Sequence, residues 1–126
     1  MKKYVLLTGA TGTVGKETLK LLCKNPNYSI TILGRDSLKN RKKLAPFMDK
    51  VKLIHADLSK ENDMAKLIGI FDVVIHLAAI IPPLANEDVE LTRKVNVLGT
   101  KNLLKRLQHI SPKCFFMYSS SIAVYG

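Results

Sequence analysis

The sequence TGATGTVG, residues 8–15, contains three glycines at three-residue spacing, a pattern that suits a phosphate-binding turn. The first glycine lets the backbone turn sharply after a strand, the second lets it approach a pyrophosphate closely, and the third lets the next helix pack tightly. Unpaired N–H groups and the positive dipole end of that helix attract phosphate. Glycines also serve any tight turn, so the flanking elements decide the interpretation. The residues assigned to this site are Gly9, Thr11, Gly12, Thr13, Val14 and Gly15.

The residues that follow the second apolar run bear on which dinucleotide would bind. At this point of a dinucleotide-binding fold, a carboxylate accepts the ribose 2′-hydroxyl, whereas an arginine suits a 2′-phosphate. Gly34 stands where the acid is expected, and Arg35 follows it. Because a guanidinium can bind a phosphate through two hydrogen bonds, this pair favours NADP(H) over NAD(H). Asp36 is expected to cap the next helix, with pairing to Arg35 as the alternative.

A parallel sheet would bring these sites together. Apolar and β-branched runs predict strands at residues 4–7, 29–33, 51–55, 71–76 and 113–118. Helical periodicity predicts helices at residues 14–22, 37–48, 63–70 and 87–109. Five strands alternating with four helices predict an α/β fold of one domain, residues 1–126. We expect a Rossmann-like, doubly wound parallel sheet in the order 3-2-1-4-5, with the cofactor at the carboxyl ends of the strands.

The fourth strand ends in residues that suit a ribose and a nicotinamide ring. Leu77, Ala78 and Ala79 follow it, and small side chains would let these groups lie against the backbone. The preceding His76 has the chemistry of an acid or base, but the period of the strand decides which face it occupies. We expect both His76 and His55 to be strand residues without a catalytic role. No metal site is assigned.

The composition, 47% hydrophobic and 24% charged, indicates an ordinary globular protein. Lys and Arg number 20 against 10 Asp and Glu, and a net charge of +10 raises the question of nucleic acid or an anionic membrane. The basic residues are spread along the chain, and the densest patch, residues 39–43, lacks aromatic neighbours that could stack on bases. We interpret this patch as a solvated helix face, with polyanion docking as the alternative.

The two cysteines and the apolar runs bear on the compartment. Cys23 and Cys114 fall within predicted elements, which favours reduced core thiols over a disulfide. The longest apolar run, residues 73–84, is interrupted by His76 and is too short to cross a bilayer. The first residues do not form a secretory signal. We therefore expect a cytoplasmic protein that does not enter the membrane.

Four segments in order resemble the extended branch of the short-chain dehydrogenase/reductase superfamily, the NAD-dependent epimerases and dehydratases. They are TGATGTVG at residues 8–15, DVVIHLAA at 72–79, VNVLGT at 95–100 and FMYSSSIAVYG at 116–126. The resemblance covers the whole chain but corresponds to only the first part, less than half, of a typical family member.

The resemblance implies roles for individual residues. Ser121 would be the catalytic hydroxyl that hydrogen-bonds the substrate oxygen, and Ser119 would lie against the nicotinamide end. Asn96 would hydrogen-bond the cofactor side of the active site. Asp57 and Leu58 are similar to the adenine-binding pair of the family, although Asp57 could equally cap a helix from Ser59 onward. The family commonly dimerises through the region of helix 87–109, so a homodimer is a hypothesis.

One part of the family chemistry is missing from the sequence. The proton donor is a Tyr with a Lys four residues later, and no Tyr of this chain has such a Lys. We expect the N-terminal cofactor-binding part of an NAD(P)-dependent epimerase, dehydratase or reductase for a nucleotide-sugar or a related carbinol or ketone. It would be truncated before the Tyr-x-x-x-Lys helix and the substrate lobe, and inactive alone. The alternative is a non-catalytic NAD(P)-binding sensor or scaffold, and a nucleic-acid binder is the weakest interpretation.

Overall fold

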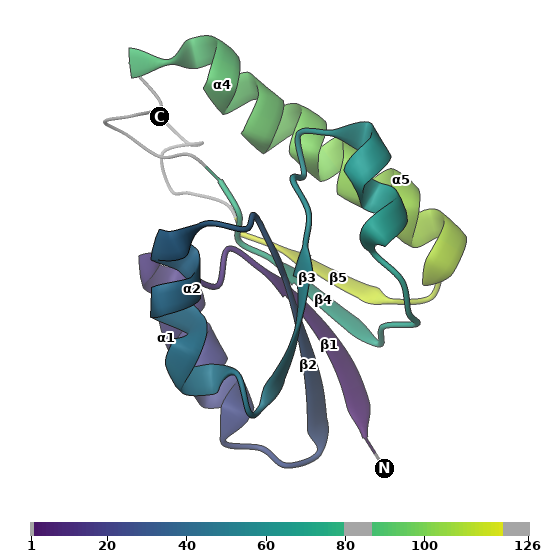
Figure 1. Cartoon of the computed structure of the whole chain (residues 1–126). Coiled ribbons are helices and arrows are strands. Elements are labelled where there is room, and N and C mark those ends of the chain that lie inside the picture. The colour runs from purple at the N-terminus through teal and green to yellow at the C-terminus, as the bar shows by residue number, and fades with distance from the viewer. Residues whose placement is uncertain (1, 80–86, 120–126) are drawn as a thin grey trace.

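A computed structural model describes residues 2–79 and 87–119, and its centre is a sheet of parallel strands (Figure 1). The order β3-β2-β1-β4-β5 confirms the predicted topology. The parallel register pairs Val5 of β1 with Ile30 of β2 and with Val73 of β4. The strands are β1 (Lys3–Thr8), β2 (Tyr28–Gly34), β3 (Val51–His55), β4 (Val73–His76) and β5 (Phe115–Tyr118).

Helices cover both faces of the sheet, as Figure 1 shows. One face carries α1 (Thr13–Cys23) and α2 (Leu38–Leu44), the latter continued by a 3₁₀ turn at Ala45–Phe47. The other face carries a 3₁₀ helix at Glu61–Lys66, α4 (Val89–Arg93), a π-helical turn at Lys94–Leu98 and α5 (Gly99–Ile110). Within the described residues, no helix has both the length and the apolarity that crossing a membrane requires.

Alternation along the central strand divides the core into two clusters. Leu6 packs with Leu103 and Leu107 of α5, whereas the next residue, Leu7, packs with Leu19 of α1 and Leu44 of α2. All six side chains are at most 4% exposed. Since successive side chains of a strand point to opposite faces, the buried β1 holds both helical layers against one sheet.

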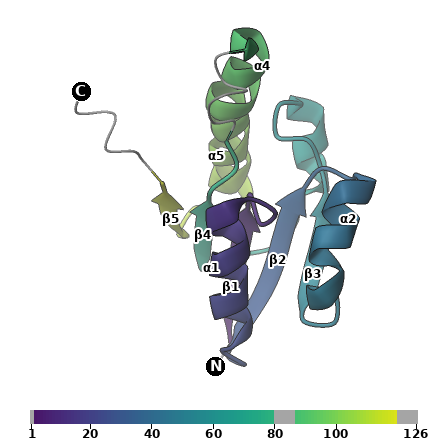
Figure 2. The same cartoon turned by 90° about the vertical axis from the view of Figure 1, so that its left-hand side faces the viewer.

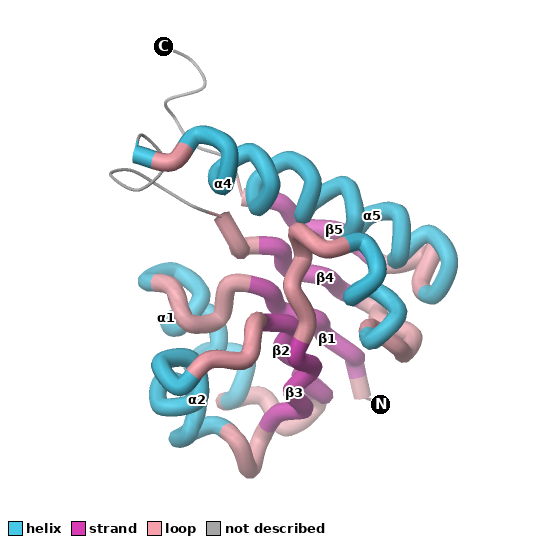
Figure 3. The backbone as a smooth tube through the Cα atoms, turned by 45° about the horizontal axis from the view of Figure 1, so that its top comes forward, coloured by secondary structure: helices cyan, strands magenta, loops and turns pink. Residues whose placement is uncertain are grey.

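Two helical predictions need correction. The segment predicted as a helix at residues 63–70 is a 3₁₀ helix at Glu61–Lys66. The predicted helix 87–109 is present, but five of its residues, Lys94–Leu98, form a π-helical turn between α4 and α5. Figure 3 shows α4, the π-helical turn and α5 as one continuous helix over the sheet. A π turn inside a helix often marks a functional region.

The strand β5 lies at one edge of the sheet, with β3 at the other (Figure 2). The side chains of β5 are largely exposed: Phe115 is 64% exposed and Met117 48%.

The two cysteines, Cys23 and Cys114, are free and partly buried, and burial raises the pKa of both thiols. The two thiols are not joined to each other, and their redox state stays a prediction.

Candidate functional site

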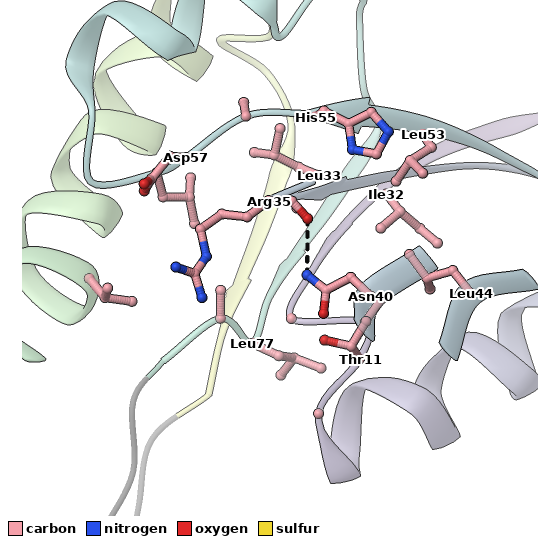
Figure 4. A pocket seen from close by; sticks show the side chains of 18 of the residues that line it. Thr11, Ile32, Leu33, Arg35, Asn40, Leu44, Leu53, His55, Asp57 and Leu77 are labelled. Atoms are coloured by element: carbon pink, nitrogen blue, oxygen red, sulfur yellow. Dashed lines mark hydrogen bonds between the residues drawn. The ribbon is translucent and has the colours of Figure 1, made fainter. Parts of the chain in front are cut away.

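The carboxyl ends of β1, β2, β3 and β4 surround a pocket of about 340 Å³ (Figure 4). A pocket at this edge of a doubly wound sheet is where dinucleotides bind. The lining residues come from segments far apart in the sequence, which the parallel topology brings together. They are residues 9–12, 32–35, 55–59 and 77–79, together with Asn40, Arg41, Leu44, Leu53, Leu91 and Val95.

The glycine turn after β1 is held by close backbone packing. Gly9 has a φ of +73°, and a Cβ atom there would lie 2.6 Å from the backbone N of Ala78. A Cβ atom on Gly15 would lie 1.8 Å from the carbonyl oxygen of Gly9. Neither position tolerates a side chain, so these two glycines fix the turn and seat α1 against it. At Gly12 the nearest atom to such a Cβ is 3.5 Å away, which leaves ordinary room.

The start of α1 leaves backbone donors for a ligand. Its N-cap residue is Gly12, which makes no side-chain cap, and the first intrahelical bond runs from the N–H of Lys16 to the carbonyl of Gly12. The N–H groups of residues 13–15 therefore have no partner within the helix. By contrast, Ser37 caps α2 and Asp88 caps α4. The uncapped N–H groups and the dipole end make the start of α1 a fitting site for an anion.

Two side chains predicted at this turn do not line the pocket. Thr13 and Val14 are exposed, Val14 by 66%, and they could contribute only through their backbone. Thr11 does line it, and its carbonyl oxygen accepts a hydrogen bond from Nζ of Lys43 at 3.4 Å. Lys43, on α2, belongs to the basic patch at residues 39–43 and places a positive charge next to the glycine turn.

Gly34 and Arg35 line the pocket at the end of β2. In Figure 4 the Arg35 side chain extends into the pocket between Asp57 and Leu77. The carbonyl oxygen of Arg35 accepts a hydrogen bond from Nδ2 of Asn40 at 3.0 Å, which fixes the backbone at this point.

The predicted role of Asp36 is wrong. Ser37, and not Asp36, caps α2: its hydroxyl accepts from the N–H of Asn40 at 3.1 Å. Asp36 instead forms a two-pronged ion pair with Arg41, and the hydrogen bond from Arg41 holds the pKa of this carboxyl below its usual value. Both are acceptable N-cap residues; in the structure Ser37 takes the cap position and Asp36 pairs with Arg41.

The end of β3 presents Asp57 and Leu58 to the pocket. Oδ1 of Asp57 accepts from the N–H and the hydroxyl of Ser59, which makes a turn; the 3₁₀ helix begins only at Glu61, so Asp57 does not cap it. The N–H of Asp57 donates to Asp63, and this bond lowers the pKa of the Asp63 carboxyl. Asp63 thereby anchors the backbone that carries the predicted adenine contacts.

The residues after β4 are held by β1. Leu77, Ala78 and Ala79 line the pocket as expected. The hydroxyl of Thr8 accepts from the N–H groups of Leu77 and Ala78, each at 3.1 Å. The strand before the glycine turn thus sets the position of the opposite wall.

The structure places His76 in the interior, away from the pocket lining. It is 1% exposed, Nδ1 lies 2.6 Å from the hydroxyl of Thr8, and Nε2 lies 2.8 Å from the hydroxyl of Thr100. Burial lowers the pKa of His76 to about 4, so the imidazole is neutral near pH 7. The alternation of β4, which also buries Val74, was the signal for this face.

The remaining predicted residues lie outside the pocket lining. Asn96 is half-buried on the π-helical turn, next to Val95, which does line the pocket. Ser119 is exposed just past β5. Ser121 falls outside the described residues, so its predicted role stays a prediction. The structure also places Asn40, Arg41, Leu91 and Val95 in the pocket lining. In the sequence, the first two lie near Arg35 and the last two near Asn96, and this proximity was the only hint.

Comparison with known proteins agrees with this arrangement. The profile of the NAD-dependent epimerase/dehydratase family matches residues 5–126. The chain belongs to this family. The assignment agrees with the resemblance drawn from the sequence and with a cofactor pocket at the carboxyl edge of the sheet.

Curated and solved members of the family show how much of such a protein the chain represents. D-erythronate dehydrogenase of Haemophilus influenzae is 32% identical over 124 residues, which are 97% of this chain and 39% of that protein. A putative UDP-glucose 4-epimerase of Methanocaldococcus jannaschii is 32% identical over 125 residues, which are 97% of this chain and 39% of that protein. The structure of UDP-glucuronic acid 4-epimerase from Bacillus cereus in complex with NAD has a TM-score of 0.79 at 29% identity, over 98% of this chain and 41% of that one. The chain thus spans about two fifths of the length of these relatives.

Proposed function

We propose that residues 1–126 form the cofactor-binding domain of an NAD(P)-dependent epimerase, dehydratase or reductase. The observation that supports this most strongly is the uncapped start of α1, which lies beside a pocket built from four strand ends. The site suits a dinucleotide in shape and in charge, because backbone donors and Lys43 meet at the glycine turn. The relatives named above act on nucleotide-sugars or a hydroxy acid by their names, so we infer a carbinol or ketone substrate, foremost a nucleotide-sugar.

We further propose that NADP(H) is preferred to NAD(H). Gly34 offers no carboxylate to a ribose hydroxyl and no negative charge to repel a phosphate. Arg35 extends into the pocket next to it. The neighbouring acid, Asp36, is held by Arg41, with an Oδ1 to Nε distance of 2.6 Å. These observations favour a phosphate rather than a hydroxyl at this end of the pocket.

The remaining assignments follow the order of the strand ends. The glycine turn would hold the diphosphate, Asp57 and Leu58 the adenine, and residues 77–79 the ribose and nicotinamide. Asn96 and Ser119 would contact the nicotinamide side. When bound, the coenzyme supplies hydride exchange with a carbinol carbon. In that reaction the hydroxyl of Ser121 would donate a hydrogen bond to the substrate oxygen and so fix its position.

A non-catalytic sensor or scaffold is the second candidate. It is favoured by the absence of any Tyr followed four residues later by Lys in the 126 residues. Because the family chemistry uses that pair to exchange the substrate proton, we propose that the 126 residues alone do not turn over. Turnover of a nucleotide-sugar or ketone by these residues would contradict this.

Calorimetric titration of the protein with NADPH and with NADH tests the proposal. We expect saturable binding of one coenzyme per chain, with NADPH tighter. Absence of binding by both coenzymes to the folded protein would overturn the proposed function. Equal or tighter binding of NADH would overturn only the preference for NADPH.

A further inference from the structure

The buried polar groups between β1, β4 and α5 form a chain whose direction can be worked out. We propose that Thr8, His76 and Thr100 form a directed hydrogen-bond chain in which His76 is a neutral imidazole protonated on Nε2. We propose that this chain positions the backbone of residues 77–79, which line the pocket, relative to α5. His76 is thus a positioning residue. The link to cofactor affinity rests on the proposed function, whereas the tautomer does not.

The direction follows from counting donors and acceptors. The hydroxyl oxygen of Thr8 has two lone pairs, and it accepts from the N–H groups of Leu77 and Ala78, at 3.1 Å each. The N–H of Leu77 is shared with the carbonyl oxygen of Thr8, at 3.3 Å. The single proton of the Thr8 hydroxyl therefore points at Nδ1 of His76, 2.6 Å away. Because Nδ1 accepts this proton, it carries none of its own. The imidazole must then bear its proton on Nε2.

The other end of the chain agrees with this assignment. Nε2 of His76 lies 2.8 Å from the hydroxyl oxygen of Thr100, and an N–H there donates to it. The hydroxyl of Thr100 in turn donates to the carbonyl oxygen of Asn96 at 2.8 Å. Each ring nitrogen of His76 thus has one hydroxyl partner, as this tautomer requires. A proton on Nδ1 would instead face an oxygen that already accepts from two N–H groups.

The surroundings of His76 shield the imidazole from water. His76 is 1% exposed, and from β5 the rings of Phe116 and Tyr118 lie against it, at centroid distances of 6.0 and 5.6 Å. Burial holds the pKa of the imidazole at about 4, which agrees with a neutral ring. In an environment that excludes water, an unmatched donor or acceptor is costly, so the chain tolerates few alternative arrangements.

The chain connects three parts of the candidate site. Thr8 directly precedes Gly9, the first glycine of the turn, and binds the two amides that follow β4. Thr100 lies just past the π-helical turn that carries Val95, another lining residue. The glycine turn, the 77–79 wall and the α4–α5 helix therefore share one set of hydrogen bonds. Loosening one link displaces the walls of the pocket relative to each other.

Nitrogen NMR of the histidine rings tests the tautomer without any cofactor. The protein contains three histidines, so His76→Gln identifies the resonances of His76 by their loss. Near pH 7 we expect an Nδ1 resonance of the unprotonated type and an Nε2 resonance of the N–H type. A proton on Nδ1, or a rapidly exchanging average of the two forms, would overturn the proposal.

Variants at Thr100 test the positioning role. Thr100→Val keeps the shape but removes the acceptor of the His76 proton, and we expect about tenfold weaker NADPH binding together with shifted Leu77 and Ala78 amide resonances. Thr100→Ser keeps the hydroxyl and should restore both. The matched control is Thr18→Val, because the hydroxyl of Thr18 also donates to the carbonyl four residues before it, at 2.9 Å, but on α1.

The outcomes separate this inference from the proposed function. If the unaltered protein binds neither coenzyme, the proposed function fails, while the tautomer and the amide shifts still decide the hydrogen-bond chain. If Thr100→Val does not fold, Thr100→Ala replaces it with a strong helix former. If the folded Thr100 variant binds NADPH like the unaltered protein and leaves the amides of residues 77 and 78 unshifted, the positioning role is overturned.

Discussion

Arg41 binds Asp36 through two hydrogen bonds, from Nε to Oδ1 at 2.6 Å and from Nη2 to Oδ2 at 2.7 Å. This pair turns the carboxylate toward α2, and Asp36 does not line the pocket, whereas its neighbour Arg35 does. The acid next to Arg35 in the sequence is thus engaged elsewhere. Arg35 is left to meet a ligand at the end of β2.

Replacing Arg35 should change the affinity for one coenzyme and not the other. Arg35→Ala removes a charged donor to the 2′-phosphate, so we expect roughly tenfold or greater loss of NADPH affinity. NADH, which lacks that phosphate, should bind as before. Arg35→Lys is the matched control, because it keeps the charge but not the two-pronged contact. Its NADPH affinity should fall between those of the unaltered protein and of Arg35→Ala. Calorimetry that finds unchanged NADPH affinity for Arg35→Ala would contradict this role.

Gly34 offers the converse experiment. A Cβ atom there would meet nothing within 4 Å, so a side chain fits without strain. Gly34→Asp supplies the carboxylate that accepts a ribose hydroxyl and repels a phosphate, so NADH should gain affinity while NADPH loses it. Gly34→Asn introduces a side chain of the same size as Asp but without the charge, so it should weaken NADPH binding less than Gly34→Asp. Titrations with both coenzymes measure the ratio, and an unchanged ratio would argue against this placement of the ribose.

Two glycines of the turn should behave differently when a methyl group is added. Gly15→Ala places a Cβ atom 1.8 Å from the carbonyl oxygen of Gly9, so we expect a loss of more than about 2 kcal/mol in unfolding free energy. Gly12→Ala has room, with 3.5 Å to the nearest atom and a φ of −77°. The Gly12→Ala variant should fold normally but bind the coenzyme more weakly, because its methyl group occupies space at the start of α1. Urea unfolding measures the stability of both variants, and calorimetry measures their coenzyme binding. Equal stability of the two variants would contradict this packing.

The topology and the glycine turn were predictable because they depend on local patterns. Apolar runs with helical repeats between them predict βα units, and chain connectivity then restricts the strand order. Asp36 shows where local reasoning fails. Aspartate and serine both suit an N-cap position, and only the folded chain shows Ser37 at the cap and Asp36 bound to Arg41.

Acid should destabilise the protein through His76. The folded-state pKa of about 4 lies below the ordinary value of 6.5, so between these pH values the unfolded chain binds a proton that the folded chain does not. The unfolding free energy therefore falls as the pH is lowered from 6.5 toward 4, by on the order of 3 kcal/mol. The groups that face His76 are Thr8 from β1, Thr100 from α5, and Phe116 and Tyr118 from β5.

Chemical denaturation across this pH range measures the effect. In His76→Gln the contribution of this group disappears, so the variant should be less stable near pH 7 but should lose less stability on acidification. An identical pH slope in the variant and the unaltered protein would assign the acid sensitivity to other groups.

The homodimer hypothesis places the contact on the long helix after residue 87. Val97 is 54% exposed and Leu104 41% exposed, which leaves apolar surface on the π-helical turn and on α5. We expect light scattering to show a mass that rises toward a dimer with concentration, and Val97→Glu with Leu104→Glu to abolish the rise. Lys101→Glu, also exposed on α5, controls for added negative charge. A monomer at all concentrations would contradict the hypothesis.

Two features of the site were beyond reach of the sequence because they depend on distant contacts. The partner of His76 on α5 is 24 residues away, and no local pattern links it to Thr100. The π-helical turn precedes Gly99, which packs on Leu58: a Cβ atom on this glycine would lie 3.2 Å from the Cβ of Leu58. The sequence showed an unusual glycine in a helix, whereas its close approach to another segment appears only in the folded chain.

The central place of β1 constrains the order in which the protein can fold. The strand β1 pairs Val5 with Ile30 on one side but with Val73 on the other. One side of β1 therefore has no partner strand until β4 has been synthesised. Contacts this distant in sequence slow folding, and the coenzyme pocket exists only once they have formed. Acquisition of coenzyme binding during translation would consequently report the docking of β4 rather than the formation of the glycine turn.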